Sequence, residues 1–356
     1  MAEQLEDRIG ALISQGQIQE AVLTSMEEGV IAVAADQRLI TLNRAGARLL
    51  GVDYVASQDR SIQEVVQDPQ LQSFITRTIF ARGPVEGEVV MQNGKQIIQA
   101  RGAVLQDTQG ADIGFLIVLH DVTELRRLEM TRRDFVANVS HELKTPITSI
   151  KGFVETLLAG ALREPENAEN FLRIMARQTD RINEIIDDLL SLSRIEREAE
   201  HGQVFLTAGK IRGVLEAAIQ VCETKAAAKN ISVDLDCPEA LRAQISAPLL
   251  EQALVNLIDN AVKFSAPGRA VRVEAQRDGA EVLVRVRDQG CGIDKNQLAL
   301  IFERFYRVDA GRSRKIGGSG LGLAIVKHIA QAHGGRVTVA SLPGQGSLFS
   351  LHLQAD

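Results

Sequence analysis

The sequence has no tryptophan and only three cysteines among its 356 residues. Cys222, Cys237 and Cys291 form no Cys-x-x-Cys pair and lack metal-ligand spacing, so we expect reduced thiols rather than a disulfide framework. No hydrophobic run approaches the roughly 18–20 residues that cross a bilayer, so no transmembrane segment is expected in this chain. The first twenty residues carry charges and glutamines, unlike a signal peptide. We therefore expect a cytoplasmic chain, either soluble by itself or the cytoplasmic portion of a membrane-anchored sensor.

The chain also lacks an excess of positive charge, because 46 acidic and 40 basic residues give a net charge of -6. Nucleic-acid binders are usually basic, so we expect no direct contact with nucleic acid. Apolar residues make up 45% of the chain, which excludes global disorder. The length predicts two or three domains.

The first of three regions with different patterns covers residues 18–120. Apolar runs at 30–35 and 38–43 flank an Ala-Asp-Gln turn and predict a hairpin. Residues 43–50 look helical and stop at Gly51. Three further strands are predicted at 85–91, 96–105 and 113–120. An antiparallel sheet with a few helices on one face follows from this pattern.

Residues 121–198 contain almost no glycine or proline and are predicted to be helical, with a break at 160–165. Each predicted helix carries an apolar stripe at alternating spacings of three and four residues. The stripes consist of Val136, Val139, Leu143, Ile150, Phe153 and Leu157, and of Phe171, Met175, Ile182, Ile185, Leu189 and Leu192. Two helices alone cannot bury both stripes, so we expect a homodimer that forms a four-helix bundle.

Residues 204–356 alternate between helical and strand patterns and predict an α/β sandwich. Helices are expected at 208–229, 246–264 and 321–333. Strands are expected at 231–236, 270–276, 281–288, 336–341 and 347–353.

His141 is the first candidate for chemistry. It lies about 200° around the helix from Val139 and Leu143, so it should point outward, as an ordinary surface histidine also would. Glu142 can fix the imidazole tautomer and accept its proton when the other nitrogen attacks phosphorus. Thr145 lies one turn on, where its hydroxyl could hold a water. It also replaces the second histidine of a His-Glu-x-x-His zinc motif, which argues against a metalloprotease.

The segment 135–146, which ends in His141-Glu142-Leu143-Lys144-Thr145-Pro146, resembles the H box of sensor histidine kinases. The resemblance implies that His141 accepts a phosphoryl group, that Glu142 is its base and that Thr145 is a phosphatase residue. Pro146 cannot donate a backbone hydrogen bond, so we expect a kink one turn after the histidine.

Three segments of the C-terminal region have the chemistry of a nucleotide site. Asn256, Asn260 and Lys263 share one helix face, which suits Mg²⁺ and phosphates but also an ordinary polar face. Asp288 follows a strand and can accept a hydrogen bond from an adenine amino group, although a simple turn would look alike. In the same segment, Gly290 and Gly292 let the backbone approach a base closely, and Ile293 beside them is a further candidate for binding the nucleotide. A glycine-rich loop before a helix can cradle phosphates; it comprises Gly318, Ser319, Gly320, Leu321 and Gly322.

In this order, these segments resemble the N, G1 and G2 boxes of the kinase's catalytic ATP-binding domain, with 302–307 similar to the F box between them. The resemblance implies ATP and Mg²⁺ as cofactors, Asn260 as a metal ligand, Lys263 as a phosphate contact and Asp288 as the adenine reader. Residues 306–319 would form a lid made basic by Arg312, Arg314 and Lys315. Related ATP-hydrolysing chaperones and topoisomerases carry a water-activating glutamate where this chain has Asn256.

Residues 28–33, 42–45 and 120–124 resemble a PAS domain. The absence of cysteine from residues 1–221 excludes a flavin–cysteine adduct. A haem bound through His120 and an unidentified small ligand stay open, and a ligand-free dimerisation or relay module is favoured. Residues 121–124 resemble the motif that couples such domains to an output helix.

The expected fold is therefore multidomain α+β, with a PAS-type sheet, a helical hairpin forming a dimeric four-helix bundle, and an α/β sandwich that binds ATP. The expected domains are an N-terminal helical segment (1–17), a PAS sensor domain (18–120), a dimerisation and phosphotransfer domain (121–198) and the catalytic domain (204–356). We expect autophosphorylation on His141, transfer to an aspartate of a response regulator, and phosphatase activity toward that regulator. A scaffold with a degenerate ATP lobe, and an ATPase of the chaperone or topoisomerase type, are the rival hypotheses.

Overall fold

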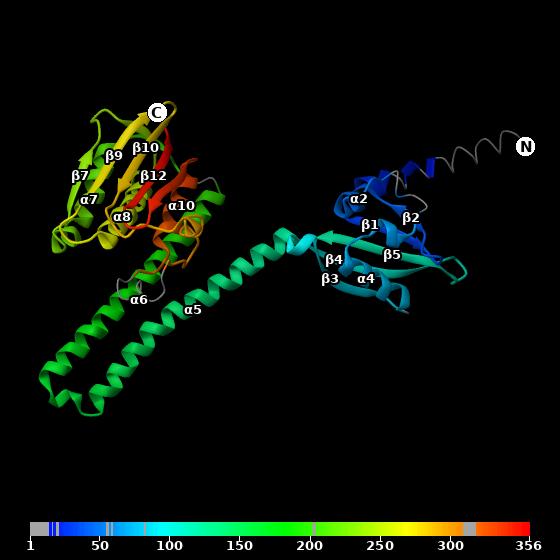
Figure 1. Cartoon of the computed structure of the whole chain (residues 1–356), viewed down its shortest axis with the longest axis horizontal. Coiled ribbons are helices and arrows are strands. Elements are labelled where there is room, and N and C mark those ends of the chain that lie inside the picture. The colour runs from blue at the N-terminus through cyan, green and yellow to red at the C-terminus, as the bar shows by residue number, and fades with distance from the viewer. Residues whose placement is uncertain are drawn as a thin grey trace, which may run out of the picture. The chain divides into compact units, whose positions relative to one another are not determined.

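The computed structural model describes residues 14–15, 17–18, 21–54, 57, 60–81, 83–201, 204–308 and 318–356. Most of the predicted N-terminal segment 1–17 and residues 309–317 of the predicted lid, with Arg312, Arg314 and Lys315, lie outside these ranges. The chain divides into two compact units, Met1–Asp134 and Phe135–Asp356 (Figure 1).

The first unit contains a five-stranded antiparallel sheet with the order β2-β1-β5-β4-β3. Its strands are β1 (Gly29–Ala34), β2 (Leu39–Leu42), β3 (Val85–Met91), β4 (Gln96–Gln106) and β5 (Asp112–Asp121). The helices are α2 (Arg44–Leu50), α3 (Ile62–Val65) and α4 (Pro69–Phe80). They share a buried core with the sheet that includes Ile31, Ile62, Leu71, Ile98 and Ile117. The predicted hairpin and the three predicted strands are confirmed.

Asn43 shows why α2 begins where the sequence predicts. Its buried side chain caps the helix by accepting the backbone N–H of Gly46, and it also accepts that of Val30. Its amide donates to the carbonyls of Leu23 and Glu28, so all of its polar capacity is used. The helix ends at Gly51 in the left-handed region, with φ of 68°.

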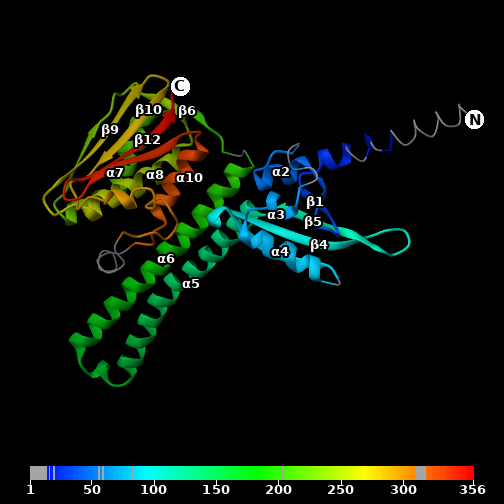
Figure 2. The ribbon, with the colours of Figure 1, turned by 45° about the vertical axis from the view of Figure 1, so that its right-hand side comes forward.

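Two long helices follow, α5 (Thr123–Leu158) and α6 (Pro165–Glu200). A short helical turn, η2 (Ala161–Arg163), joins them into an antiparallel hairpin, as both ribbon views show (Figures 1 and 2). The break begins at Gly160, whose φ of 128° a side chain would disfavour, and Pro165 occupies the first turn of α6. Within the described ranges, neither of these helices nor any other is apolar over a stretch long enough to cross a membrane.

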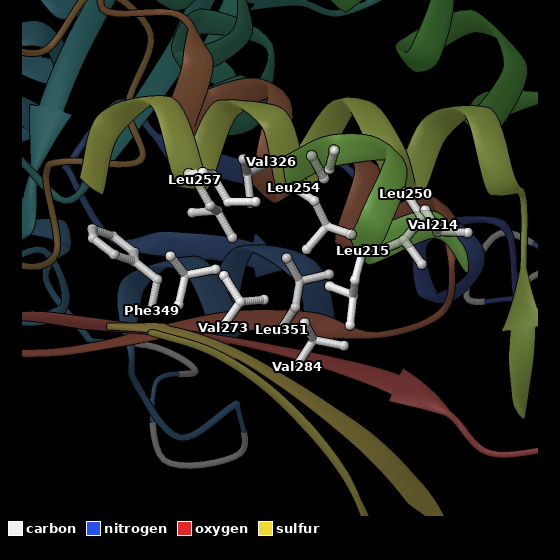
Figure 3. Close-up of a cluster of buried hydrophobic side chains, with 14 of the residues drawn as sticks. Val214, Leu215, Leu250, Leu254, Leu257, Val273, Val284, Val326, Phe349 and Leu351 are labelled. Atoms are coloured by element: carbon white, nitrogen blue, oxygen red, sulfur yellow. The ribbon is translucent and has the colours of Figure 1, made fainter. Parts of the chain in front are cut away.

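The C-terminal lobe is a two-layer α/β structure. Its sheet has the order β11-β12-β10-β9-β7, in which only β7 and β9 are parallel. The strands are β7 (Ser232–Asp236), β9 (Ala270–Asp278), β10 (Glu281–Arg287), β11 (Arg336–Leu342) and β12 (Gly346–Gln354). Helices α7 (Ile211–Ala228), α8 (Ala247–Phe264) and α10 (Gly322–Ala332) pack on one face, where their apolar side chains meet those of the strands (Figure 3).

A second, two-stranded sheet was not predicted. It pairs β6 (Thr207–Lys210) with β8 (Arg242–Ile245), so the helix expected from residue 208 begins only at Ile211. The local pattern could not reveal this strand, because it is stabilised by pairing with a partner more than thirty residues away.

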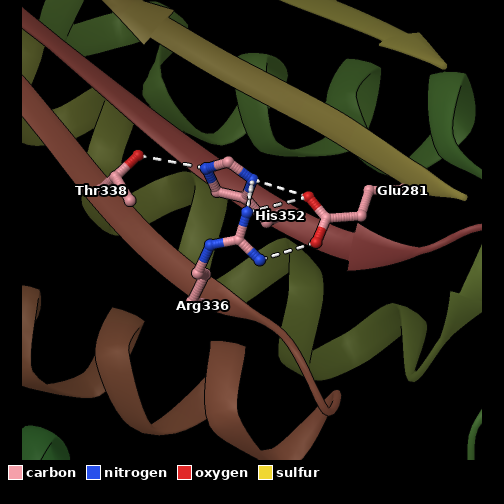
Figure 4. Close-up of polar contacts among 4 residues, drawn as sticks. All are labelled: Glu281, Arg336, Thr338 and His352. Carbon is pink, nitrogen blue, oxygen red and sulfur yellow. Dashed lines mark hydrogen bonds and ion pairs between the residues drawn. The ribbon is translucent and has the colours of Figure 1, made fainter. Parts of the chain in front are cut away.

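The outer face of the main sheet carries a polar cluster across three strands (Figure 4). Arg336 donates to both carboxylate oxygens of Glu281, over 2.6 and 3.1 Å, and the imidazole of His352 lies 2.9 Å from the same carboxylate. Thr338 completes the cluster through the other ring nitrogen of His352. Arg336 first, and then His352, lower the pKa of the Glu281 carboxyl. The cluster ties β11 and β12 to β10.

Candidate functional site

His141 lies near the middle of α5 with its side chain exposed, while Val139 and Leu143 are partly buried, as the helical spacing predicts. Thr145 is also exposed, and its hydroxyl donates a hydrogen bond of 3.1 Å to the carbonyl oxygen of His141. A shallow hollow of about 330 Å³ is lined by His141, Lys144, Thr145 and Thr148. A phosphoryl donor or acceptor can therefore reach the imidazole from solvent.

Glu142 points toward the second helix of the hairpin. Its Oε2 accepts a hydrogen bond of 2.9 Å from Nη2 of Arg181 on α6. The two side chains are 29% and 18% exposed, respectively, so this ion pair is shielded from water on most sides. No local sequence pattern marks Arg181, because it meets Glu142 only after the hairpin has formed.

The first nucleotide segment lies on α8. The side-chain nitrogen Nδ2 of Asn256 is buried and has no acceptor within the part of the chain that the structure describes. A methyl group at Gly322 would lie 3.5 Å from Oδ1 of Asn256, and one at Gly318 would lie 2.5 Å from Nζ of Lys263. The fold therefore brings Asn256 and Lys263 to the predicted phosphate loop.

Lys263 is poorly solvated at this position. Burial lowers the pKa of its ammonium, while Asp259 opposes the shift. Asp259 itself is paired with Lys225 of α7 over 2.6 Å. A phosphate group beside Lys263 would supply a close counter-charge to this desolvated cation. Asn260 lies half-buried on the same helix.

Asp288 follows β10 and is almost fully buried. Its Oδ1 accepts the backbone N–H groups of Gly290, at 2.8 Å, and Ser347, at 3.1 Å. Burial raises the pKa of the Asp288 carboxyl, and these hydrogen bonds oppose the shift. The Ser347 side chain also hydrogen-bonds this carboxyl. The two oxygens of a carboxylate offer about four acceptor positions, so the group can still accept from a ligand amino group.

The backbone around Asp288 is too close to other chain segments for larger residues. A Cβ atom at Gly292, whose φ is 69°, would lie 2.0 Å from the carbonyl oxygen of Leu342. At Gly290 it would lie 2.7 Å from the carbonyl oxygen of Phe264. The backbone N–H of Ile293 donates 2.8 Å to the Ser341 hydroxyl. These contacts fix the loop that the sequence assigns to adenine.

The glycine-rich loop is held by the segment that resembles the F box. Phe305 adopts a φ of 63° and donates its N–H to the carbonyl of Gly320 over 3.0 Å. The Ser319 hydroxyl accepts the N–H of Leu321 at 3.1 Å, immediately before α10 begins. The first backbone N–H groups of α10, which have no acceptor within the helix, therefore lie at the glycine-rich loop, where an anion could accept from them.

Several polar contacts join this lobe to α6, and the sequence does not predict them. Nε2 of Gln252 on α8 donates a hydrogen bond of 2.6 Å to the Ser191 hydroxyl. The Ser319 hydroxyl donates 2.5 Å to Oδ2 of Asp188. Glu196 pairs with Arg304 and lies 3.2 Å from the imidazole of His328. Burial raises the pKa of the Asp188 carboxyl, and the Ser319 hydrogen bond opposes this. Asp188 and Glu196 lie among other charged residues of α6, so no local pattern distinguishes them.

An aromatic contact joins α5 to the same region of the lobe. The rings of Phe135 and Phe305 have centroids 5.9 Å apart, and the guanidinium of Arg304 lies 5.3 Å from the centroid of Phe135. Phe135 opens the segment that resembles the H box, so the histidine helix touches the nucleotide lobe at this residue.

The donor set suits Mg²⁺ only together with a polyphosphate. The described residues contain no group of three or more histidine, cysteine, aspartate and glutamate side chains that could hold a metal. Asn260 would supply a single amide oxygen, and Mg²⁺ takes its other ligands from phosphates and water at such sites. The buried Nδ2 of Asn256, which has no acceptor among the described residues, and the desolvated ammonium of Lys263 fit the phosphate part of this arrangement.

An exposed histidine on a helical hairpin, joined to a lobe with an asparagine helix, a buried aspartate and a glycine loop, defines the class of proteins that move phosphoryl groups through histidine. Residues 131–198 match the family described as the His Kinase A (phospho-acceptor) domain, and 245–356 match the histidine kinase-, DNA gyrase B- and HSP90-like ATPase family. Residues 23–127 match the PAS fold. The chain belongs to the sensor histidine kinase family.

Curated relatives agree over nearly the whole chain. The sensor protein kinase WalK of Staphylococcus aureus is 32% identical over 346 residues, covering 95% of this chain and 80% of that protein. WalK of Staphylococcus saprophyticus is 33% identical over the same share of this chain, which spans only 55% of that longer protein. The fold is also similar to histidine kinase ThkA in its complex with response regulator TrrA, with a TM-score of 0.51 and 21% identity over 94% of this chain and 98% of that one.

Proposed function

We propose that this protein phosphorylates itself on His141 with ATP and passes the phosphoryl group to an aspartate of a response regulator. The observation that carries the proposal is the pairing of an exposed imidazole on α5 with a lobe in which Asn256 and Lys263 lie beside the glycine-rich loop. The match of residues 131–198 to the phospho-acceptor domain supports the same assignment.

In the proposed reaction, one nitrogen of neutral His141 attacks the γ-phosphorus of ATP. The N–P bond forms, the bond from that phosphorus to the bridging oxygen breaks, and ADP leaves. The other nitrogen gives its proton to Glu142. Asp288 holds the adenine amino group, Lys263 contacts the phosphates, and Mg²⁺ on Asn260 would neutralise charge on them. Asn256 stands where related ATPases have a water-activating glutamate, which favours transfer to histidine over hydrolysis.

The partner proposals follow the same chemistry. The complex of ThkA with response regulator TrrA supports a receiver-domain protein as the partner here. Thr145, one turn from His141, would position a water for dephosphorylation of that regulator. A homodimer would cover the apolar residues that α5 and α6 leave exposed, such as Ile147 at 53% and Leu190 at 66%. We retain 1–17, 18–120, 121–198 and 204–356 as the proposed domains, acting in the cytoplasm.

Labelling with γ-³²P ATP tests the proposal. The wild type should gain a label that acid removes and alkali leaves, and a receiver-domain protein added afterwards should take it up. His141→Gln should gain none, whereas His201→Gln, which changes an exposed histidine at the end of α6, should label normally. Undiminished label in His141→Gln would contradict the proposal. Thr145→Ala should still label but should slow dephosphorylation of the regulator.

A further inference from the structure

Arg181 is a residue that no sequence motif of the chain marks. It lies on α6, 18% exposed, with Nη2 donating to Oε2 of Glu142 over 2.9 Å. Ion pairs on the open surface contribute little, because water and mobile ions compete with them. This pair is shielded by both helices, so the carboxylate is held in one place on the residue that follows His141.

The guanidinium uses only part of its capacity. Its Nε is buried and has no acceptor within the described ranges. Arginine can hold both oxygens of a carboxylate at once, but here the recorded bond reaches Oε2 alone. Oε1 of Glu142 is therefore left as an acceptor for another donor.

The imidazole of His141 is the donor that the proposed reaction would bring to Oε1. A carboxylate has two oxygens and can accept from a guanidinium and from an imidazole N–H together. We propose that Arg181 is a positioning residue for autophosphorylation, which anchors Oε2 of Glu142 so that Oε1 can take the proton from His141. This inference rests on the proposed function and adds to it the residue through which α6 controls the base.

The proton balance is simple. The imidazole proton moves to Oε1 as the N–P bond forms and ADP leaves, and solvent removes it from Glu142 afterwards. Arg181 keeps its charge throughout. Because Arg181 and Glu142 stand on different helices, any shift of α6 along α5 would move the base relative to the histidine. A simple brace between two helices is the competing explanation, and the test must separate the two.

The test uses the 356-residue chain. It measures the initial labelling rate at saturating ATP and the ATP concentration at which the labelling rate is half of that value. Arg181→Met should lower the saturating rate on the order of tenfold to a hundredfold, as loss of a general base's support does. The half-saturating ATP concentration should not change, because within the described ranges Arg181 bonds Glu142 of α5 and no residue of the nucleotide lobe. Arg181→Lys should recover part of the rate. Arg177→Met, which removes an exposed arginine one turn earlier, should label normally.

The decisive comparison is made in the Glu142→Gln background. If Arg181 acts through Glu142, adding Arg181→Met there should cause no further loss. If the labelling rate falls there as much as it does in the wild-type background, Arg181 only links the two helices structurally. A normal labelling rate in Arg181→Met alone would exclude a role of Arg181 in autophosphorylation. Both outcomes overturn the inference while the wild type still labels. Absence of label from the wild type would instead contradict the proposed function.

Discussion

At the scale of single residues, His333 shows how one buried imidazole secures the nucleotide lobe. It is fully buried at the end of α10, its Nδ1 bonds the carbonyl of Ile329 at 2.8 Å, and its Nε2 accepts the N–H of Ser246 at 3.0 Å. Ser246 precedes α8, the helix that carries Asn256 and Asn260. Burial lowers the pKa of His333, because the charged imidazolium is poorly solvated there, and the two backbone hydrogen bonds oppose this shift.

The depressed pKa of His333 predicts acid sensitivity. The unfolded chain binds a proton on this residue as the pH falls below its ordinary value of about 6.5, while the folded chain resists. The stability that neutral His333 contributes is therefore present above that pH and is lost as the pH falls toward the lower folded value. Urea unfolding between about pH 8 and 5.5 should show a smaller acid loss in His333→Gln than in the wild type. Parallel curves would contradict this.

Asp288 carries a prediction about affinity. Replacing its carboxylate with an amide removes an acceptor for the adenine amino group and places a donor near two backbone N–H groups. Asp288→Asn should weaken ATP binding at least about tenfold, as expected for a hydrogen bond to a charged group. Calorimetric titration with ATP measures this, and Asp278→Asn, an exposed change on β9, is the control. Equal affinities for Asp288→Asn and the wild type would exclude the adenine role.

At the scale of elements, α5 contains a proline in its interior, Pro146, which is buried one turn after His141. Its ring nitrogen cannot donate to the carbonyl of Glu142. The kink that the sequence predicts there stays a prediction. The same helix contains Gly152, where an added methyl group would meet nothing within 4 Å.

These two positions predict gains in helix stability. Pro146→Ala should raise the free energy of unfolding by about 1–3 kcal/mol, because it restores a hydrogen bond and removes a steric conflict. Gly152→Ala should add about 0.5–1 kcal/mol from backbone entropy alone, and it calibrates the measurement. Urea denaturation followed by circular dichroism is the assay. A loss of stability in Pro146→Ala would show that the packing of the buried ring outweighs the helix conflict.

Elements were predictable where their signal is local. Gly51 and the stretch at 160–165 end helices through their own backbone preferences, so the observed ends of α2 and α5 agree with the sequence. The alternation of apolar residues located β3, β4 and β5 in the same way. The sequence does not predict β6, because this strand depends on long-range pairing with β8. The helix predicted at 208–229 therefore overlaps the strand.

At the scale of the whole molecule, the unit Phe135–Asp356 joins the histidine hairpin to the nucleotide lobe. Within this unit, the Asp188 carboxylate on α6 accepts a hydrogen bond from the Ser319 hydroxyl of the glycine-rich loop. A carboxylate at that place adds negative charge where the ATP phosphates would lie. Binding of ATP must therefore proceed against Asp188 or displace it.

Removing the negative charge of Asp188 should tighten nucleotide binding. Asp188→Asn keeps an acceptor for Ser319 but removes the negative charge, so it should strengthen ATP binding on the order of twofold to tenfold. Calorimetry on the full-length chain measures it, with Asp187→Asn as an exposed neighbour for comparison. The effect should shrink at high salt, since ions screen the repulsion. Unchanged or weaker binding would mean that Asp188 does not compete with the phosphates.

The residues of the candidate site show the same difference between local sequence signals and long-range contacts. The sequence alone predicts His141, Asn256, Asn260 and Asp288. Each stands in a continuous segment whose residue types and spacing indicate its chemistry. Arg181 and Asp188 belong to the site only because α6 lies against α5 and the lobe, and they carry no local pattern. The basic lid residues stay predictions.

The most direct test of the account is the location of the phosphoryl group after incubation with ATP and Mg²⁺. Trypsin should release residues 134–144 as one peptide, which contains His141 and also Ser140. Mass spectrometry in alkaline buffer should find one phosphoryl group on this peptide, fragmentation should place it on His141, and brief acid treatment should remove it. An acid-stable phosphate on Ser140, a phosphate on another peptide, or none at all would contradict the account.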